Sequence, residues 1–321
     1  KKKEEARMGG QLPVDEQSGD HRRHQRHQHH QHDHSHTTTF QQHVVAATGE
    51  FVGTFMFLFM GYSGHLMILD QVSTDRNSVA NSSLGFLQTM AVGFTYGFSL
   101  LVSVWAFYRI SGGLFNPAVC LPLSSSLSRP VAHLSQLSTS LAKQTLMIQR
   151  NSQVTLGLCL ANQLPWTRAA FLMPTQLIAC MCAGGVVRAM FPGDLAGVNT
   201  ILAPGVNIAQ GLFAEMFFTA YLVFVVLMLA AEKSRDTFLA PVGIGLALLV
   251  AEIPGVFYTG GSLNPARSFG CAVASASFPG YHWIYWLGPV LGAVLAAAYF
   301  RFVKAWHYEE ANPGQDADSE V

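Results

Sequence analysis

Residues 260–270 have the sequence Gly-Gly-Ser-Leu-Asn-Pro-Ala-Arg-Ser-Phe-Gly, and residues 112–119 have the similar sequence Gly-Gly-Leu-Phe-Asn-Pro-Ala-Val. Asparagine is a favoured N-cap, proline is tolerated at the first helical position, and alanine propagates a helix, so each stretch predicts a helix start. Both follow long apolar runs. Asn-Pro also marks ordinary turns. Two copies in equivalent places favour two short helices. Inside a membrane, the free N–H groups and the positive dipole end of each helix start require a partner or a function.

The composition is that of a polytopic membrane protein. Of the 321 residues, 50% are hydrophobic and 12% are charged, and the mean hydropathy is positive, which is too apolar for an ordinary soluble globule. The formal net charge of zero argues neither for nor against nucleic acid, but no basic stripe with interleaved aromatic residues is present, so nucleic acid is not an expected partner. The five cysteines lie mostly within apolar runs without disulfide or metal-ligand spacing. No cofactor or metal is expected.

Six apolar segments are each long enough to cross a bilayer. They span residues 44–69, 85–110, 169–190, 206–231, 238–258 and 282–303. The first carries Glu50 and the fourth carries Glu215, each followed four residues later by a threonine. A carboxylate inside an apolar helix should face the bundle interior and accept hydrogen bonds there. Both are therefore predicted to be structural buried carboxylates that brace the loops, with proton carriage in a transporter as the alternative.

The segments form two similar halves. Each half consists of two spans, an Asn-Pro-Ala stretch and a third span, and each opens with the glutamate-bearing helix. Because three is an odd number, the halves must have opposite orientations, as in inverted-repeat membrane proteins. The predicted fold class is an all-α membrane protein with six transmembrane helices and two half-helices that converge at the midplane. Basic residues concentrate on the side of both termini, which predicts that the termini are cytoplasmic.

The two ends differ in composition from the predicted channel domain, residues 44–305. Residues 1–43 are polar, and eight of the sixteen residues from His21 to His36 are histidine. Such a segment cannot build a core, so a disordered tail is predicted, with metal binding or pH sensing as the alternative. Residues 306–321 are acidic and are also predicted to form a disordered tail.

Convergence of the two short helices would place Asn116 and Asn264 side by side within the membrane. Their amide groups can donate to a passing neutral molecule, while the two positive dipole ends oppose cations and interrupt proton hopping. The sequence shows no nucleophile–base pair, phosphate loop or carboxylate dyad, so an enzyme is not expected. A passive pore is the leading interpretation. A secondary transporter with glutamate proton carriers and a structural protein built on a closed pore are the alternatives.

The paired stretches resemble the motifs of the major intrinsic protein family, the aquaporins and aquaglyceroporins. The resemblance rests on Ser-Gly-Gly-x-x-Asn-Pro-Ala-Val from Ser111 and Thr-Gly-x-x-x-Asn-Pro-Ala-Arg-Ser-Phe-Gly from Thr259. The Gly-Gly-Leu-Phe variant and the His/Gln-rich tail are similar to fungal members. The family implies transport of water or small neutral solutes, contact with membrane lipid, a plasma-membrane location and a homotetramer with one pore per subunit. The pore motifs are then Asn116, Pro117, Ala118, Asn264, Pro265 and Ala266.

By the same resemblance, a narrow outer selectivity filter consists of Tyr96, Glu252, Gly261 and Arg267. Water-selective members usually have phenylalanine and histidine at the first two places, so this filter departs from their pattern. We expect Glu252 to pair with Arg267, or the filter to be wider or differently polar because Gly261 removes bulk. In the alternative, Glu252 turns into a helix contact. Further markers are similar to water channels, namely Ser268, Ala272 and Tyr285-Trp286, so water leads, with glycerol or hydrogen peroxide as the alternative.

An atypical insertion near residues 120–153 interrupts the first half. Family members have Asn-Pro-Ala-Val-Thr-Leu/Phe-Gly without a break, whereas here about thirty-five Ser-, Leu- and Gln-rich residues separate the two parts of that string. Pro122 would fall in the second turn of the half-helix, where proline costs about 3 kcal/mol. The hypothesis is a retained intron or a non-conducting isoform, and the alternative is a gating loop with phosphorylatable serines. The chain as written is predicted to conduct poorly.

Overall fold

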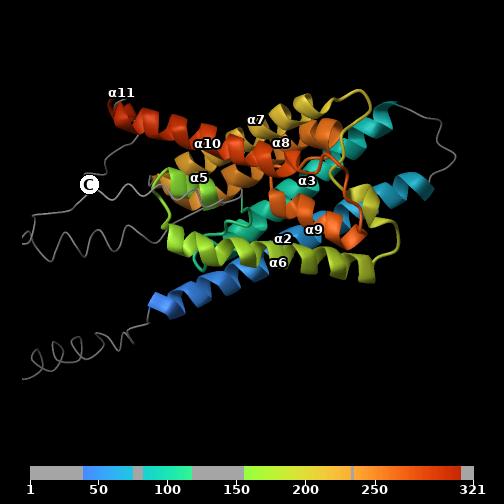
Figure 1. The fold of residues 1–321 in the computed structure, drawn as a ribbon, viewed down its shortest axis with the longest axis horizontal. Coiled ribbons are helices and arrows are strands. Elements are labelled where there is room, and N and C mark those ends of the chain that lie inside the picture. The colour runs from blue at the N-terminus through green and yellow to red at the C-terminus, as the bar shows by residue number, and fades with distance from the viewer. Residues whose placement is uncertain (1–38, 75–81, 118–154, 233–234, 312–321) are drawn as a thin grey trace, which may run out of the picture. The chain divides into compact units, whose positions relative to one another are not determined.

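The computed structural model describes residues 39–74, 82–117, 155–232 and 235–311. In these ranges the regular structure is helical throughout, without a strand. The long helices are α2 (Thr39–Thr74), α3 (Ser82–Phe107), α6 (Trp166–Met190), α7 (Ile208–Val226), α8 (Ala240–Thr259) and α10 (Ile284–Ala305), as Figure 1 shows. The short elements are α5 (Thr155–Leu160), α9 (Pro265–Ser275), α11 (Tyr308–Ala311), two 3₁₀ turns at Leu195–Val198 and Arg235–Leu239, and a π-helical turn at Leu227–Ala231.

Six of these helices are long and apolar enough to cross a membrane, which confirms the six predicted spans. Their ends differ from the predicted ones, most clearly in α2, which begins at Thr39 and ends at Thr74. The prediction placed the ends where polarity changes, but the polar residues on either side also accept helical geometry. The start of α2 therefore lies within the stretch predicted to be tail, and residues 1–38 lie outside the described residues.

The predicted C-terminal tail also begins with regular structure. Helix α11 follows α10 directly, and Lys304 Nζ donates to Glu309 Oε1 at 2.7 Å and to Glu232 Oε1 at 2.9 Å. These bonds join the end of α10 to α11 and to the residue that follows the π-helical turn. A disordered tail starting at residue 306 was therefore wrong for Tyr308–Ala311, and residues 312–321 lie outside the described part of the chain.

The helix ends in the second half follow the expected capping chemistry. Asn207 and Gln210 form a reciprocal capping box at the start of α7, which satisfies two free N–H groups. Helix α8 ends at Gly260, whose φ of 82° places it in the left-handed region, where glycine is the favoured C-terminal residue. Gly260 thus marks where the chain leaves α8 and enters the second Asn-Pro-Ala loop.

Helices α3 and α8 cross at a pair of glycines. A Cβ at Gly97 would lie 3.0 Å from the carbonyl oxygen of Gly245, and a Cβ at Gly245 would lie 2.8 Å from that of Gly97. Small residues of this kind let membrane helices approach closely where no hydrophobic effect draws them together. The contact is reciprocal, as expected when the two helices are equivalent members of an inverted repeat.

Two further helix pairs also depend on glycine. Gly288 and Gly292 of α10 face α7, where Cβ atoms would lie 2.7 Å from Glu215 Cβ and 2.4 Å from the carbonyl oxygen of Met216. Gly270 of α9 faces α6, where a Cβ would lie 2.6 Å from the carbonyl oxygen of Cys180. The ribbon in Figure 1 shows α9 beside α6. Close packing with α6 therefore holds the second half-helix in place.

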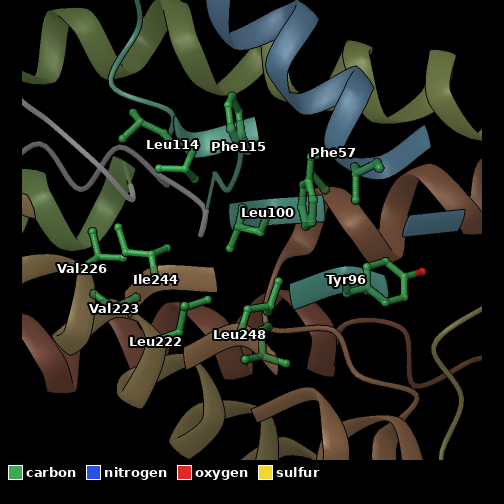
Figure 2. Packing of buried hydrophobic residues seen from close by; sticks show 14 of the residues in the cluster. Phe57, Tyr96, Leu100, Leu114, Phe115, Leu222, Val223, Val226, Ile244 and Leu248 are labelled. Carbon is green, nitrogen blue, oxygen red and sulfur yellow. The ribbon is translucent and has the colours of Figure 1, made fainter. Parts of the chain in front are cut away.

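The apolar interior and the apolar surface have different roles. Buried side chains from α3, α7 and α8 gather around the bundle centre, together with Leu114 and Phe115 of the first loop (Figure 2). Large apolar side chains also point outward from the long helices, for example Val102 at 64% exposed and Phe217 at 59%. An outward apolar surface of this extent fits contact with lipid.

Candidate functional site

The two Asn-Pro-Ala loops have the same backbone geometry. Relative to each asparagine, the residues four, three and one positions earlier have positive φ angles. These are Gly112 (107°), Gly113 (64°) and Phe115 (51°) in the first loop, and Gly260 (82°), Gly261 (62°) and Leu263 (48°) in the second. Positive φ at a bulky residue such as Phe115 or Leu263 is uncommon and persists only where surrounding contacts impose it. The repeat detected in the sequence therefore extends to individual backbone angles.

Glu50 supplies these contacts in the first loop. Its Oε1 accepts hydrogen bonds from Ser111 Oγ at 2.7 Å and Leu114 N at 2.9 Å. Its Oε2 accepts from Phe115 N at 2.9 Å and Gln176 Nε2 at 2.7 Å. With four donors the carboxylate is fully hydrogen-bonded, which is what a buried charge inside a helix bundle requires.

Glu215 makes the equivalent bonds in the second loop. Its Oε1 accepts from Thr259 Oγ1 at 2.6 Å and Ser262 N at 3.0 Å, and its Oε2 accepts from Leu263 N at 2.8 Å. The donors occupy the positions of Ser111, Leu114 and Phe115 in the other half. Both glutamates thus lie behind the loops, where their oxygens are occupied by the loop backbone.

The two asparagines tie the loops together. Asn116 Nδ2 donates to the carbonyl of Leu263 at 2.9 Å, and Asn264 Nδ2 donates to the carbonyl of Phe115 at 2.8 Å. Asn264 Oδ1 accepts from Ala266 N at 2.9 Å, the N-cap bond of α9, and Pro265 is the first helical residue. Since an amide nitrogen carries two hydrogens, the bond across the loops leaves one hydrogen of Asn264 available.

The second half-helix, α9, is anchored at both ends. Ser262 Oγ and Ser268 Oγ lie 2.5 Å apart near its start. At its end, Arg188 Nη1 donates to the carbonyl of Ala274, and Asn199 Nδ2 donates to Ser275 Oγ at 3.0 Å. A cation at a helix C-terminus is favourable because it meets the negative end of the helix dipole.

Helix α5 occupies the corresponding place in the first half. Ala118 lies outside the described residues, but Thr155 Oγ1 donates to the carbonyl of Asn116 at 3.4 Å. Arg301 Nη1 of α10 donates to the carbonyl of Leu160 at 3.4 Å, as Arg188 of α6 does at the end of α9. Gly157 faces α7 and α10, with a Cβ position 2.6 Å from Val223 Cγ1 and 3.9 Å from the carbonyl oxygen of Ala293.

The register of α5 matches that of α9. If residues 119–153 are left out of the count, Thr155 follows Asn116 by four positions, as Ser268 follows Asn264. Gly157 then takes the sixth position, as Gly270 does. Thr155 and Gly157 of α5 thus take the places that Ser268 and Gly270 hold in α9.

Arg267 and Tyr96 form one wall of the candidate filter. The Arg267 guanidinium lies 4.9 Å from the centroid of the Tyr96 ring, a cation–π arrangement. Arg267 Nη1 donates to the carbonyl of Val198 at 2.9 Å, whereas Nε and Nη2 are buried without a protein partner. Arg267 also lines the internal cavity described below, so these donors are available to a molecule in that cavity.

Glu252 differs from the two bracing glutamates. It is 1% exposed, and its Oε2 has no hydrogen-bond partner. The carboxylate lies against Gly261, where a Cβ would collide with Oε2. The described residues contain no ion pair between Glu252 and Arg267, so the expected pairing was wrong. The carboxylate occupies the space that a side chain at residue 261 would fill.

A narrow internal cavity of about 20 Å³ lies between these groups. Its polar lining consists of Asn116, Asn264, Glu252, Ser262 and Arg267, and its apolar lining includes Phe57, Leu100, Leu222, Ile244 and Leu248. Figure 2 labels apolar side chains of this lining, which come from α2, α3, α7, α8 and the first loop. A second cavity, which we call the outer vestibule, lies at the end of the bundle where α2 ends, and its lining includes His65, Asn199, Ile253 and Gly260.

Two residues of α2 near the filter were not predicted from the sequence. Tyr62 donates its hydroxyl to the carbonyl of Arg267 at 2.6 Å. His65 lies edge-to-face with Tyr96, with ring centroids 6.0 Å apart. Counting positions from the Asn-Pro-Ala stretches finds only residues of α3, α8 and the second loop. The available signal was a histidine inside an otherwise apolar span.

The sequence matches the major intrinsic protein family over residues 34–135 and 150–300. The interruption, residues 136–149, lies inside the predicted insertion. A probable aquaporin-3 of Gibberella zeae is 58% identical over 289 residues, covering 89% of this chain and 87% of the relative. Aquaporin-7 of Botryotinia fuckeliana is 45% identical over 284 residues, covering 88% of this chain and 54% of the relative.

The fold is similar to that of a solved channel. The X-ray structure of the aquaglyceroporin from Plasmodium falciparum aligns with a TM-score of 0.57 at 18% identity, covering 81% of this chain and 95% of that one. The fold is therefore aquaporin-like and all-α, because the described residues contain six spans and no strand and align with this structure. With the family match over most of its length, the chain belongs to the major intrinsic protein family and is a multi-pass membrane channel for small solutes.

Proposed function

We propose that the chain is a passive water channel in which solute passes the filter at Arg267 and the two Asn-Pro-Ala loops in single file. The observation that carries this proposal is the row of polar groups along the cavity. Arg267 keeps two donors without a protein partner, and Asn264 keeps one amide hydrogen. The rest of the cavity lining is largely apolar, so a water molecule is bound at few points and can leave each of them.

The converging helix starts favour neutral solutes. Helix α9 begins at Pro265 beside the cavity, and its N-terminus carries a partial positive charge. In the first half, Thr155 Oγ1 at the start of α5 donates to the carbonyl of Asn116, so that the positive end of this short helix also lies beside the loop. Together with the Arg267 guanidinium, these groups oppose cation entry and hold water in an orientation that interrupts proton transfer along the file.

The bracing glutamates support a passive mechanism over proton-coupled transport. Every oxygen of Glu50 and Glu215 accepts at least one hydrogen bond from the loops or from a neighbouring helix. A proton carrier must instead be free to bind and release a proton along the transport path. Glu50 and Glu215 therefore act as structural groups that hold Asn116 and Asn264 in position.

Glycerol is the second candidate solute, favoured by the apolar wall of the cavity. Leu222, Ile244 and Leu248 could pack against a carbon backbone while Glu252 and Arg267 bond to hydroxyl groups. The contact of Glu252 with Gly261 supports water instead, because it fills the space that a larger solute would need. Hydrogen peroxide resembles water in size and bonding and is part of the same test.

We also propose that residues 119–153 are extra to the pore. The matching register of α5 and α9 supports this proposal, because the half-helix site is filled by residues from beyond the segment. The segment is then a retained intron or the mark of a poorly conducting isoform, with a gating loop as the alternative. Sequencing mature transcripts decides the first point: if most of them encode residues 121–151, the intron proposal fails.

Further proposals concern the assembly and its place in the cell. We propose a homotetramer in the plasma membrane, with one pore per subunit and both termini in the cytoplasm. The outward apolar side chains supply surface for contact with lipid and with other subunits. Cross-linking of purified protein in detergent tests the tetramer, and protease protection in sealed vesicles tests the orientation.

The solute is tested by stopped-flow light scattering of liposomes that contain the purified chain. Shrinkage in a sucrose gradient reports water, and gradients of glycerol and hydrogen peroxide report those solutes. The proposal predicts faster water flux than in protein-free liposomes and a smaller gain for glycerol. Glu252→His should raise the water-to-glycerol ratio if Glu252 lines the filter, and an unchanged ratio would refute that assignment. Val102→Ala, on the lipid-facing surface, is the matched control.

A further inference from the structure

The filter side chain Tyr96 lies directly against α2. Gly61 lacks a Cβ, and the Tyr96 ring occupies the space, since a Cβ there would lie 2.5 Å from Tyr96 Cε1. Next to Gly61, Tyr62 donates to the carbonyl of Arg267 at 2.6 Å. His65 follows Gly61 by one helical turn, so both lie on the same face of α2. This face of α2 therefore forms the back of the filter.

His65 holds the Tyr96 ring from the outer side. The two rings meet edge-to-face, with centroids 6.0 Å apart and an interplanar angle of 85°. Phe57, two turns earlier on α2, makes a similar contact at 6.5 Å and 75°. The Arg267 guanidinium lies 4.9 Å from the ring centroid. Phe57 and His65 are the two α2 side chains in contact with the ring, and of these His65 also lines the outer vestibule.

One nitrogen of the buried His65 imidazole lacks a hydrogen-bond partner. His65 is 6% exposed, and its Nδ1 is buried without a hydrogen-bond partner. It lies within electrostatic reach of Arg267, whose Nε and Nη2 are also unpaired. A buried polar ring at this place is unfavourable for stability alone, which points to a role in the passage of solute.

We propose that His65 is a positioning residue for selectivity: its ring holds Tyr96 against Arg267 and keeps the filter too narrow for glycerol to pass as readily as water. The inference rests on the proposed channel function. Without the imidazole, the Tyr96 ring can turn into the vacated space, away from Arg267. The passage then widens, and glycerol gains more than water does.

Three substitutions separate the ring contact from the polar character of His65. His65→Ala removes both, His65→Gln keeps a polar group without a ring, and His65→Phe keeps the ring without nitrogens. The readout is the glycerol-to-water permeability ratio of liposomes that contain the full chain. The ratio should rise roughly two- to tenfold in His65→Ala and His65→Gln, in line with the loss of one aromatic contact. His65→Phe should have the same ratio as the unaltered chain.

Met67→Ala is the control, because Met67 lies on the same helix and is 51% exposed. An unchanged ratio in His65→Ala and His65→Gln overturns the inference, as does an equal rise in His65→Phe. If the unaltered chain passes neither solute, the proposed function fails, and the structure of His65→Gln then decides the inference. A Tyr96 ring displaced from Arg267 supports it, and a ring that stays in place overturns it.

Discussion

Replacement of Glu215 by alanine should destabilise the protein through two buried backbone groups. In the folded chain Glu215 accepts from Ser262 N and Leu263 N, and both residues are at most 1% exposed. The third donor, Thr259 Oγ1, also lies 3.0 Å from the carbonyl of Gly255 and so keeps a partner. Two N–H groups lose their acceptor, at about 1–3 kcal/mol each. The expected loss is therefore about 2–6 kcal/mol.

The assay is thermal unfolding of the detergent-solubilised protein, followed by size-exclusion chromatography after heating. A loss of this size should lower the Tm by at least about 3 °C. Glu215→Gln keeps one acceptor oxygen and should lie between the unaltered chain and Glu215→Ala. Glu232→Ala is the matched control, because Glu232 makes a partly exposed ion pair with Lys304, expected to contribute about 0–1 kcal/mol. Equal Tm values for Glu215→Ala and Glu232→Ala would refute the bracing role of Glu215.

The remaining predictions concern helix packing, pH and the filter. Gly97→Val should prevent close crossing of α3 and α8, because even a Cβ at Gly97 would lie 2.5 Å from Leu249 Cβ. The expected result is loss of the monodisperse peak in size-exclusion chromatography. Gly185→Ala is the control, because Gly185 has open space around it, and it should leave the peak unchanged. Burial lowers the pKa of His282 below its usual 6.5, so the unfolded chain binds more protons and stability should fall as pH drops below about 6.5. His282→Phe should flatten the change in Tm between about pH 7 and pH 5, and an equally steep curve would contradict the assignment. Arg267→Ala should raise the glycerol-to-water permeability ratio, because the cation over Tyr96 is lost; a ratio no higher than that of the unaltered chain would contradict its place in the filter.

The helical class and the repeat could be predicted from sequence because both depend on local patterns. Apolar length gave the six spans, and Asn264 followed by Pro265 gave the start of α9. The ends of α2 and the helix at Tyr308–Ala311 could not be predicted in the same way. Their polar residues are compatible with either helix or coil, and tertiary contacts such as the bond from Lys304 to Glu309 decide between them.

The details of the filter depend on contacts between distant segments. Counting from the motifs identified Tyr96, Glu252 and Arg267, but spacing alone could not show that the Glu252 carboxylate turns toward Gly261. His65 is far from either motif in the sequence and reaches the filter only because Gly61 lets Tyr96 pack against α2. A histidine in an apolar span was visible, but its partner was not.

The first half-helix gives the clearest contrast between local and long-range information. The interrupted motif was evident from the sequence, and so was the matching string that resumes at Thr155. The sequence could not show that α5 would take the position equivalent to that of α9, with Arg301 at its end as Arg188 is at the end of α9. That outcome depends on the packing surfaces of α7 and α10, which accept Gly157 at close range.

The most direct test of the pore is the water permeability of liposomes that contain either the full chain or the chain without residues 119–153. Stopped-flow shrinkage in a sucrose gradient gives the rate, with protein-free liposomes as the baseline. If α5 completes the first half-helix, both proteins should exceed the baseline, and the shortened chain should be the faster of the two. Rates for both proteins no higher than that of protein-free liposomes would contradict the assignment of this chain as a water channel.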